Sequence, residues 1–273
     1  MKTREELENL ARNIRADVIN MTYNSRVSGG HVGGSLSLAE ILAVLYGAVM
    51  KVNYRDYDNE SRDRLILSKS HAALALYSAL SYAGFISREE IEMAMKENSF
   101  FYKHPQKAPQ YGIECSGGSL GMGLSFGMGM GYAMRLNGIE DSRVFVIVGD
   151  GECNEGSIWE AANSIIHYGL NNVLTIVDNN NLQIDGTNKE VMNMGSLKDR
   201  WKSIGFNVVE VNGHDVMELQ KVFNETRTIP TVVMCNTIKG KGVSFAENVR
   251  DWHVGRLTDE QRDVALQEIL GNA

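Results

Sequence analysis

Residues 144–186 read VFVIVGDGECNEGSIWEAANSIIHYGLNNVLTIVDNNNLQIDG, and this stretch decides the fold. Val144 to Val148 is an apolar run, too short for a helix and rich in β-branched side chains, so it predicts a strand buried on both faces. A helix is predicted from about Ser157 to Tyr168, opening with a capping-box pattern at Ser157 and Glu160. Val173 to Val177 predicts a second buried strand. A right-handed crossover makes the strands parallel, so their carboxyl ends meet at one edge of the sheet.

Oxygen-bearing groups follow both predicted strands. The GDG turn places Asp150 after the first strand, and the second is followed by a run of asparagines that includes Asn180. With the backbone carbonyl of Leu182, they offer three protein oxygens, a set that suits Mg²⁺, or Ca²⁺ or Mn²⁺ in its place, with coordination positions left for a diphosphate. The simpler interpretation is that these side chains only satisfy loop N–H groups. The complete strand, GDG, helix, strand, DNNN order favours the metal and diphosphate.

Composition limits the class of protein. With 273 residues, 43% hydrophobic content, three prolines and no low-complexity stretch, the chain is expected to form one α/β domain over residues 1–273. A net charge of −7 argues against nucleic acid as a partner. Cys115, Cys153 and Cys235 have no CxxC spacing and are interpreted as reduced thiols of a cytoplasmic protein. The charged, amphipathic start is not a signal peptide, and no apolar run is long enough to span a membrane.

The GDG turn, followed about thirty positions later by an asparagine loop, resembles the thiamine diphosphate motif, and its surroundings resemble transketolase. Four further segments stand in the family's order and extend the resemblance over nearly the whole chain: Ser28–His31, Asp63–His71, Gly118–Gly123 and Thr237–Gly242. The resemblance implies a three-layer αβα fold with a mostly parallel sheet, the diphosphate-binding (PP) module of thiamine enzymes. It also implies thiamine diphosphate and Mg²⁺ as cofactors.

Three histidines stand where the family contacts its sugar substrate. His31 lies in the loop SGGHVGGS, whose glycines let the backbone fold tightly around the imidazole. His104 precedes a proline, and His253 follows a tryptophan in a later loop. The resemblance implies that all three bind sugar hydroxyls and that His253 also reaches the diphosphate. A structural hydrogen bond is the simpler role for a lone histidine. Val32 and Lys103 replace the Pro and Gly that are usual beside the first two histidines.

Two further strand ends carry basic residues. Ser68–His71 lies at a predicted strand-to-helix turn, which suits an anion because a helix N-terminus adds N–H donors. His71 matches the family residue that touches the diphosphate, whereas Lys69 is a weaker candidate and is equally well explained as a surface charge. Lys239, among the glycines of TIKGKG, also suits phosphate, with a solvated turn as the alternative. Gly151 of the GDG turn completes the implied diphosphate contacts.

The segment Gly118–Gly123 opens a predicted helix and does not match a nucleotide-binding loop. Gly123, Gly127 and Gly131 are spaced four residues apart, which predicts a groove for close helix packing. The resemblance implies that this helix lies where subunits associate. It also implies that the backbone at Gly118, Ser119 and Leu120 borders the pyrimidine ring of the cofactor. Ser119 and Met122 stand where the family commonly has Pro and Gln.

Two acidic or basic residues have ordinary structural interpretations. Glu155 suits the N-terminus of the helix that follows it, because the helix dipole favours a negative charge there. The resemblance also implies that Glu155 helps to position an activating glutamate of the partner module. His214 precedes Asp215 and Glu218, whose spacing is that of a helix cap, and capping is the best explanation of this segment.

Thiamine chemistry needs a carboxylic acid to protonate the aminopyrimidine of the cofactor. In transketolase this acid belongs to a pyrimidine-binding domain, and neither that domain nor the family's C-terminal domain is found in the sequence. We therefore expect the N-terminal subunit of a two-component transketolase, which works with a partner chain in an α2β2 assembly. It would transfer a two-carbon ketol unit from a ketose phosphate to an aldose phosphate.

Three alternatives remain open from the sequence. The chain can be a split transketolase for an unusual sugar, such as a branched or sulfonated ketose phosphate. It can be the α subunit of a 2-oxo acid dehydrogenase, although that family is expected to lack His31, His71 and His253. It can also be a non-catalytic protein that binds a metal and a diphosphate.

Overall fold

The computed structural model describes residues 2–25 and 27–271. The α-helices are α1 Arg4–Asn24, α2 Val32–Leu36, α3 Ala39–Val44, α4 Ala73–Tyr82, α5 Arg88–Met93, α6 Met122–Leu136, α7 Gly156–His167, α8 Asn188–Val191, α9 Leu197–Ile204, α10 Val216–Asn224 and α11 Asp259–Leu270. The strands are β1 Arg64–Leu67, β2 Val144–Gly149, β3 Val173–Asn179, β4 Asn207–Asn212 and β5 Thr231–Asn236. Short π or 3-10 turns cover Leu45–Val49, Tyr54–Asp56, Ser70–Ala72, Pro109–Tyr111, Gly151–Asn154 and Arg250–His253. None of the described helices combines the length and apolar character needed to cross a membrane.

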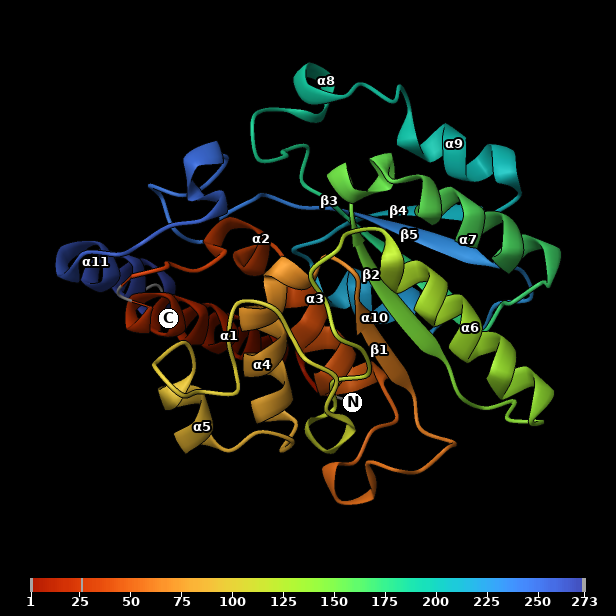
Figure 1. The fold of residues 1–273 in the computed structure, drawn as a ribbon, viewed down its shortest axis with the longest axis horizontal. Helices are drawn as coiled ribbons and strands as arrows, with labels where there is room; N and C mark the ends of the chain where they lie inside the picture. Colours follow the sequence, from red (N-terminus) through yellow and green to blue (C-terminus); the bar gives the residue numbers. More distant parts are fainter. Residues whose placement is uncertain (1, 26, 272–273) are drawn as a thin grey trace.

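The five described strands form one parallel sheet in the order β1, β2, β3, β5, β4 (Figure 1). Strands β2 and β3 are direct neighbours, with Val148 opposite Val177 and Gly149 opposite Asp178. Because the strands are parallel and in this register, the GDG turn and the asparagine run leave the sheet at the same edge. The predicted strand–helix–strand unit is confirmed.

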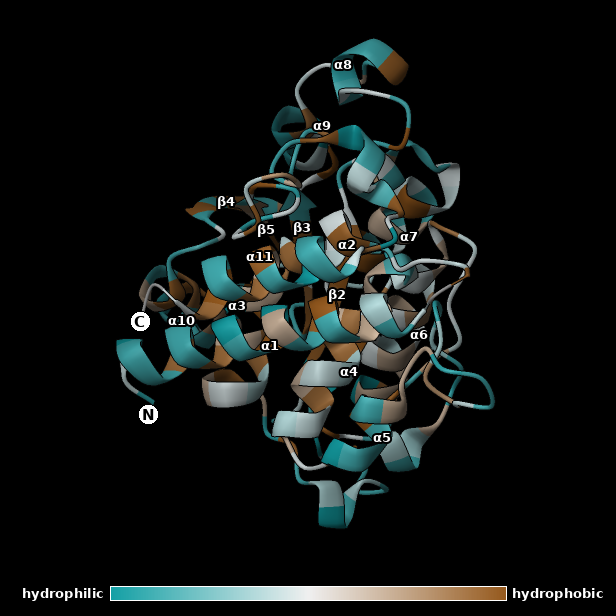
Figure 2. Ribbon diagram, turned by 90° about the vertical axis from the view of Figure 1, so that its left-hand side faces the viewer, coloured by the Kyte–Doolittle hydropathy of each residue, from teal (hydrophilic) through white to brown (hydrophobic). Residues whose placement is uncertain are grey.

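Helices cover both faces of the sheet, which confirms the three-layer αβα prediction. Phe145 and Ile147 of β2 pack into a core with α1, α3, α4 and α10. Val144, Val146 and Val148 point to the opposite face and pack with α6, α7 and α9. In Figure 1, α6 and α7 lie on one side of the sheet and α1 and α4 on the other. Figure 2 shows apolar strands between helices whose outer surfaces are hydrophilic.

Two local predictions around β2 and β3 are corrected. The capping box at Ser157 and Glu160 is wrong: α7 begins at Gly156, and the Ser157 hydroxyl donates to the carbonyl of Gly121 at 3.0 Å. The edge strand β4, which no pattern predicted, has only one buried residue, Val211. An edge strand buries little of its surface, so its sequence lacks the continuous apolar run that marks the central strands.

The glycines of α6 also differ from prediction. Their face packs on the sheet, where a Cβ on Gly127 would lie 2.3 Å from Val146 of β2 and one on Gly131 would lie 2.3 Å from Val173 of β3. Gly123 is buried in the same way against the end of β1. The prediction of a helix–helix groove for self-association through these glycines is therefore wrong, because they let α6 approach its own sheet. Apolar side chains that remain exposed on α6 are Met122, Phe126 and Leu136.

Candidate functional site

A cavity of about 510 Å³ opens at the carboxyl edge of the sheet. It gathers twelve of the residues predicted from the sequence: His31, His71, His104, Gly118, Leu120, Asp150, Gly151, Glu155, Asn180, Leu182, Lys239 and His253. They come from separate chain segments, and the fold brings them together because the βα turns of a parallel sheet meet at one edge. Ser119, between two lining residues, is exposed and does not line the cavity.

Asp150 and Asn180 are nearly buried at this edge, at 6% and 7% exposure. The Asp150 carboxylate accepts hydrogen bonds from the backbone N–H of Gly151 and Asn181 and from the amide of Asn188. Burial and the neighbouring Asp178 carboxylate raise the pKa of Asp150 to about 6. A buried carboxylate held by neutral donors lacks the positive charge that normally stabilises it.

The amide of Asn180 has a defined orientation. Its Nδ2 donates to Asp178 at 3.1 Å, and its Oδ1 accepts from the backbone N–H of Leu182 at 3.1 Å. The oxygen is therefore the atom on the side of the Leu182 turn. Carboxylate, amide and carbonyl oxygens of Asp150, Asn180 and Leu182 line one cavity and fit Mg²⁺, which prefers oxygen donors. Among the described residues no cluster of three His, Cys, Asp or Glu can hold a metal, so a metal here depends on this mixed oxygen set.

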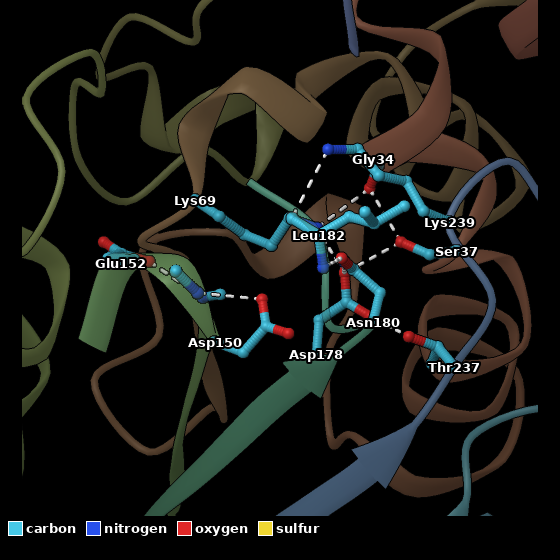
Figure 3. A network of polar contacts seen from close by, with 12 residues as sticks. Gly34, Ser37, Lys69, Asp150, Glu152, Asp178, Asn180, Leu182, Thr237 and Lys239 are labelled. Carbon is cyan, nitrogen blue, oxygen red and sulfur yellow. Dashed lines mark hydrogen bonds and ion pairs between the residues drawn. The ribbon is translucent and has the colours of Figure 1, made fainter. Parts of the chain in front are cut away.

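Figure 3 shows Asp178 at the centre of a polar network at the end of β3. Its fully buried carboxylate accepts from Lys69, Ser37, Thr237 and Asn180. Burial would raise the pKa of Asp178, but the Lys69 ammonium outweighs it and keeps that pKa below its ordinary value. Lys69 is itself 1% exposed and also donates to the carbonyl of Gly34. The surface-charge interpretation of Lys69 is therefore wrong.

Lys239 reaches the same edge from the loop after β5. Its Nζ lies 3.1 Å from the carbonyl oxygen of Gln183, 3.4 Å from that of Leu182 and 3.2 Å from Nδ1 of His253. Burial and the charge of Lys69 lower the pKa of Lys239 to about 8. The side chain is 2% exposed, so the solvated-turn interpretation is wrong. Lys239 is placed as a buried cation beside the candidate metal oxygens.

The four histidines form one cluster in the cavity. The ring of His31 lies 5.4 to 5.6 Å, between centroids, from those of His71, His104 and His253. Burial and neighbouring positive charges lower the pKa of His31 to about 4 and that of His253 to about 3, and lower the pKa values of the other two in the same direction. All four rings are therefore neutral near pH 7. A neutral imidazole donates from one nitrogen and accepts at the other, which suits a sugar hydroxyl.

The loops that carry two of these histidines are joined to each other. Lys103, which replaces the family's glycine, donates from Nζ to the carbonyl of Ser28 at 2.6 Å. The Tyr102 hydroxyl lies 3.0 Å from that of Ser28. These contacts tie the His104 loop to the His31 loop. His31 Nδ1 is buried and has no hydrogen-bond partner among the described residues, so a polar ligand in the cavity can satisfy it.

Sequence reasoning missed Glu152, the buried acid that follows the GDG turn. Its carboxylate accepts from the hydroxyl of Ser68 and from the backbone N–H groups of Gly121 and Gly149, so it joins the loops after β1 and β2 to the start of α6. Its signal in the sequence is weak, because an acid after a strand is usually solvated. Glu155, by contrast, is exposed at the N-cap of α7 and makes no side-chain cap there, which leaves its carboxylate at the cavity.

This geometry defines a class of thiamine diphosphate-binding domain, and comparison with known proteins gives the family. The family model described as transketolase, thiamine diphosphate binding domain, matches residues 5–272, and the chain belongs to this family. One of the named subunits of the apulose-4-phosphate transketolase of Phocaeicola vulgatus is 39% identical over 270 residues, 97% of this chain and 94% of that protein. The 6-deoxy-6-sulfo-D-fructose transketolase subunit SqwG of Clostridium sp. (strain MSTE9) is 36% identical over 243 residues, 88% of each.

The solved transketolase from Campylobacter jejuni superposes with a TM-score of 0.84 at 29% identity. The match covers 98% of this chain and 43% of that one, so the chain spans less than half the length of the solved enzyme. Family membership favours the transketolase prediction over the dehydrogenase α subunit. The two relatives above, which match over most of their length, carry the word subunit in their names.

Proposed function

We propose that this protein is the N-terminal, diphosphate-binding subunit of a two-component transketolase. One observation carries the proposal: the cavity brings together oxygen donors for a divalent metal, a buried lysine without a carboxylate partner, and a cluster of four histidines. Relatives of matching length are named as transketolase subunits, which supports a partner chain that supplies the pyrimidine and C-terminal domains.

In this proposal Asp150, Asn180 and the Leu182 carbonyl hold Mg²⁺, and the metal in turn holds the diphosphate. When bound, thiamine diphosphate supplies the electron sink for breaking and forming the bond next to a ketose carbonyl. Lys239 offers charge-assisted hydrogen bonds to the diphosphate. Further contacts to the cofactor are assigned to His71, His253, Gly118, Ser119, Leu120 and Gly151.

The chain's histidines are assigned to the substrate. Because His31, His104 and His253 have lowered pKa values, each ring is neutral and can bind a sugar hydroxyl as donor or as acceptor. The same neutrality lets a ring take a proton from one substrate oxygen and return it to another. Glu155, exposed at the cavity, is assigned to contact with the partner subunit, where it would orient the acid that acts on the aminopyrimidine.

The donor sugar is proposed to be an unusual ketose, branched or sulfonated, rather than a common pentose or hexose phosphate. The proposal is supported by the substrates in the names of two relatives, apulose-4-phosphate and 6-deoxy-6-sulfo-D-fructose. The replacement of the family's glycine by Lys103, which joins the two histidine loops, also sets this cavity apart.

The test is co-expression with a candidate partner that carries the pyrimidine domain, followed by size determination, calorimetry and a transfer assay. We expect an α2β2 complex that binds thiamine diphosphate only with Mg²⁺ and transfers a two-carbon unit from one member of a ketose panel. A complex that binds the cofactor and transfers nothing from any ketose would instead support a non-catalytic binding protein.

A further inference from the structure

His214 lies in the turn between β4 and α10, a segment that the sequence explained as a helix cap. Asp215 alone performs that capping, by accepting from the backbone N–H groups of Met217 and Glu218. The His214 ring has different contacts. Its Nδ1 lies 2.9 Å from the carboxylate of Glu40 in α3, and its Nε2 accepts from the backbone N–H of Ile238 at 2.8 Å.

The neighbours of His214 fix which nitrogen carries the proton. Glu40 is bound by Arg15 of α1 at 2.6 Å, and although burial opposes ionisation, Arg15 and the hydrogen bond from His214 hold the pKa of Glu40 at about 2. A carboxylate only accepts hydrogen bonds, so Nδ1 must donate. A backbone N–H only donates, so Nε2 must keep its lone pair. Arg15 and Glu40 together therefore orient the ring so that Nε2 faces Ile238.

Ile238 directly precedes Lys239, and the backbone around this lysine is anchored to three different elements. The Thr237 hydroxyl donates to Asp178 of β3, the Ile238 N–H donates to His214, and the Gly240 N–H donates to the carbonyl of Gly33 in α2 at 3.0 Å. The side chain of Lys239 is left to reach into the cavity. The anchors on both sides decide where its ammonium group lies.

We propose that His214 is a positioning residue for Lys239: by accepting from Ile238 it holds the loop backbone that aims the lysine into the cavity. The role in ligand binding rests on the proposed function, because that proposal assigns Lys239 to the diphosphate. The role in loop geometry does not, since it follows from the contacts of the chain alone.

Two substitutions separate the acceptor role from simple burial. His214→Gln keeps an acceptor near the position of Nε2, whereas His214→Asn reaches only the position of Nδ1 and keeps the Glu40 contact. Hydrogen exchange of the full chain measures protection of residues 237–242. We expect exchange in the Asn variant to be at least about tenfold faster than in the native protein, and exchange in the Gln variant to stay within about threefold. Equal protection in both variants would overturn the proposal.

His167→Asn is the matched control, because His167 is exposed on α7 and far from this loop in the sequence. It should leave exchange over residues 237–242 unchanged. A measurement on the native protein needs no variant: a long-range ¹H–¹⁵N correlation spectrum reads the tautomer of His214. The Nδ1–H form is expected at neutral pH, and an Nε2–H form would contradict the proposal even if the Asn variant fails to fold.

Calorimetry of the complex with the partner subunit then links the loop to the ligand. With Mg²⁺ and thiamine diphosphate, His214→Asn should weaken binding about tenfold, and His214→Gln should restore most of the affinity. Should exchange respond as expected while even the native complex binds no cofactor, the positioning role stands and the proposed function falls. Should the cofactor bind equally to all variants, the positioning role falls and the proposed function stands.

Discussion

The turns after β1 and β5 each place a lysine at the same edge of the sheet, and the two lysines differ in their partners. Lys69 is 1% exposed and forms an ion pair with the buried Asp178. Lys239 is 2% exposed, but among the described residues its ammonium contacts the carbonyls of Leu182 and Gln183 and a neutral imidazole. Burial alone does not define the role of a lysine. Its counter-ion does, and the contrast marks Lys69 as structural and Lys239 as available to an anion.

The most severe test of this comparison removes the counter-ion of Lys69. Asp178→Asn leaves a buried ammonium without its carboxylate, so we expect a loss of about 3–5 kcal/mol in the free energy of unfolding, measured with denaturant. The double variant Lys69→Met with Asp178→Leu removes both charges and should recover much of that loss. An Asp178→Asn protein that unfolds at the native denaturant concentration would show that the pair is not structural.

The second lysine should give the opposite result. Lys239→Met removes a charge that has no carboxylate partner, so stability should change little, while affinity for thiamine diphosphate and Mg²⁺ in the complex should fall about tenfold to a hundredfold. Calorimetry measures the affinity and denaturant unfolding the stability. If Lys239→Met unfolds the protein and leaves affinity intact, the two lysines have been assigned the wrong way round.

The pH dependence of stability sharpens the comparison further. The pKa values of His31 and His253, about 4 and about 3 in the fold, lie below the ordinary value of 6.5, so the folded state resists protonation. Stability is therefore complete above about pH 6.5 and is lost as the pH falls toward 4. Thermal unfolding between pH 5 and 8, a range set by the histidine pKa, should show this decline, and His31→Gln should reduce it. A melting temperature that is constant or rises on acidification would contradict these shifts.

The smallest effect is expected at the neighbouring lysine of the same turn. Lys241 is partly exposed and pairs with Glu247 at 3.2 Å, outside the cavity lining. Lys241→Met should change the free energy of unfolding by no more than about 0.5 kcal/mol and leave cofactor affinity within about twofold, because exposed ion pairs contribute little. A large loss of affinity in this variant would extend the anion site beyond Lys239.

Much of the fold could be predicted from local patterns. The buried strands β2, β3 and β5 appear as short apolar runs, and α1 begins with a capping box at Thr3 and Glu6. The edge strand β4 and the short helices α8 and α9 were not predicted, because marginal burial leaves only a weak hydrophobic period. The glycines of α6 were recognised as packing positions, but spacing alone does not tell a helix partner from a sheet.

The sequence by itself determined the strand–turn–helix order and the chemical types at each turn, because hydrophobic period and turn residues act over a few positions. It therefore identified Asp150, Asn180 and Lys239 as candidates. Only the tertiary structure decided which charges neutralise each other, since Lys69 and Asp178 are 109 positions apart and His214 and Glu40 are 174 apart. Such pairings depend on how distant segments pack into one low-dielectric interior, where a charge is stable only beside its partner.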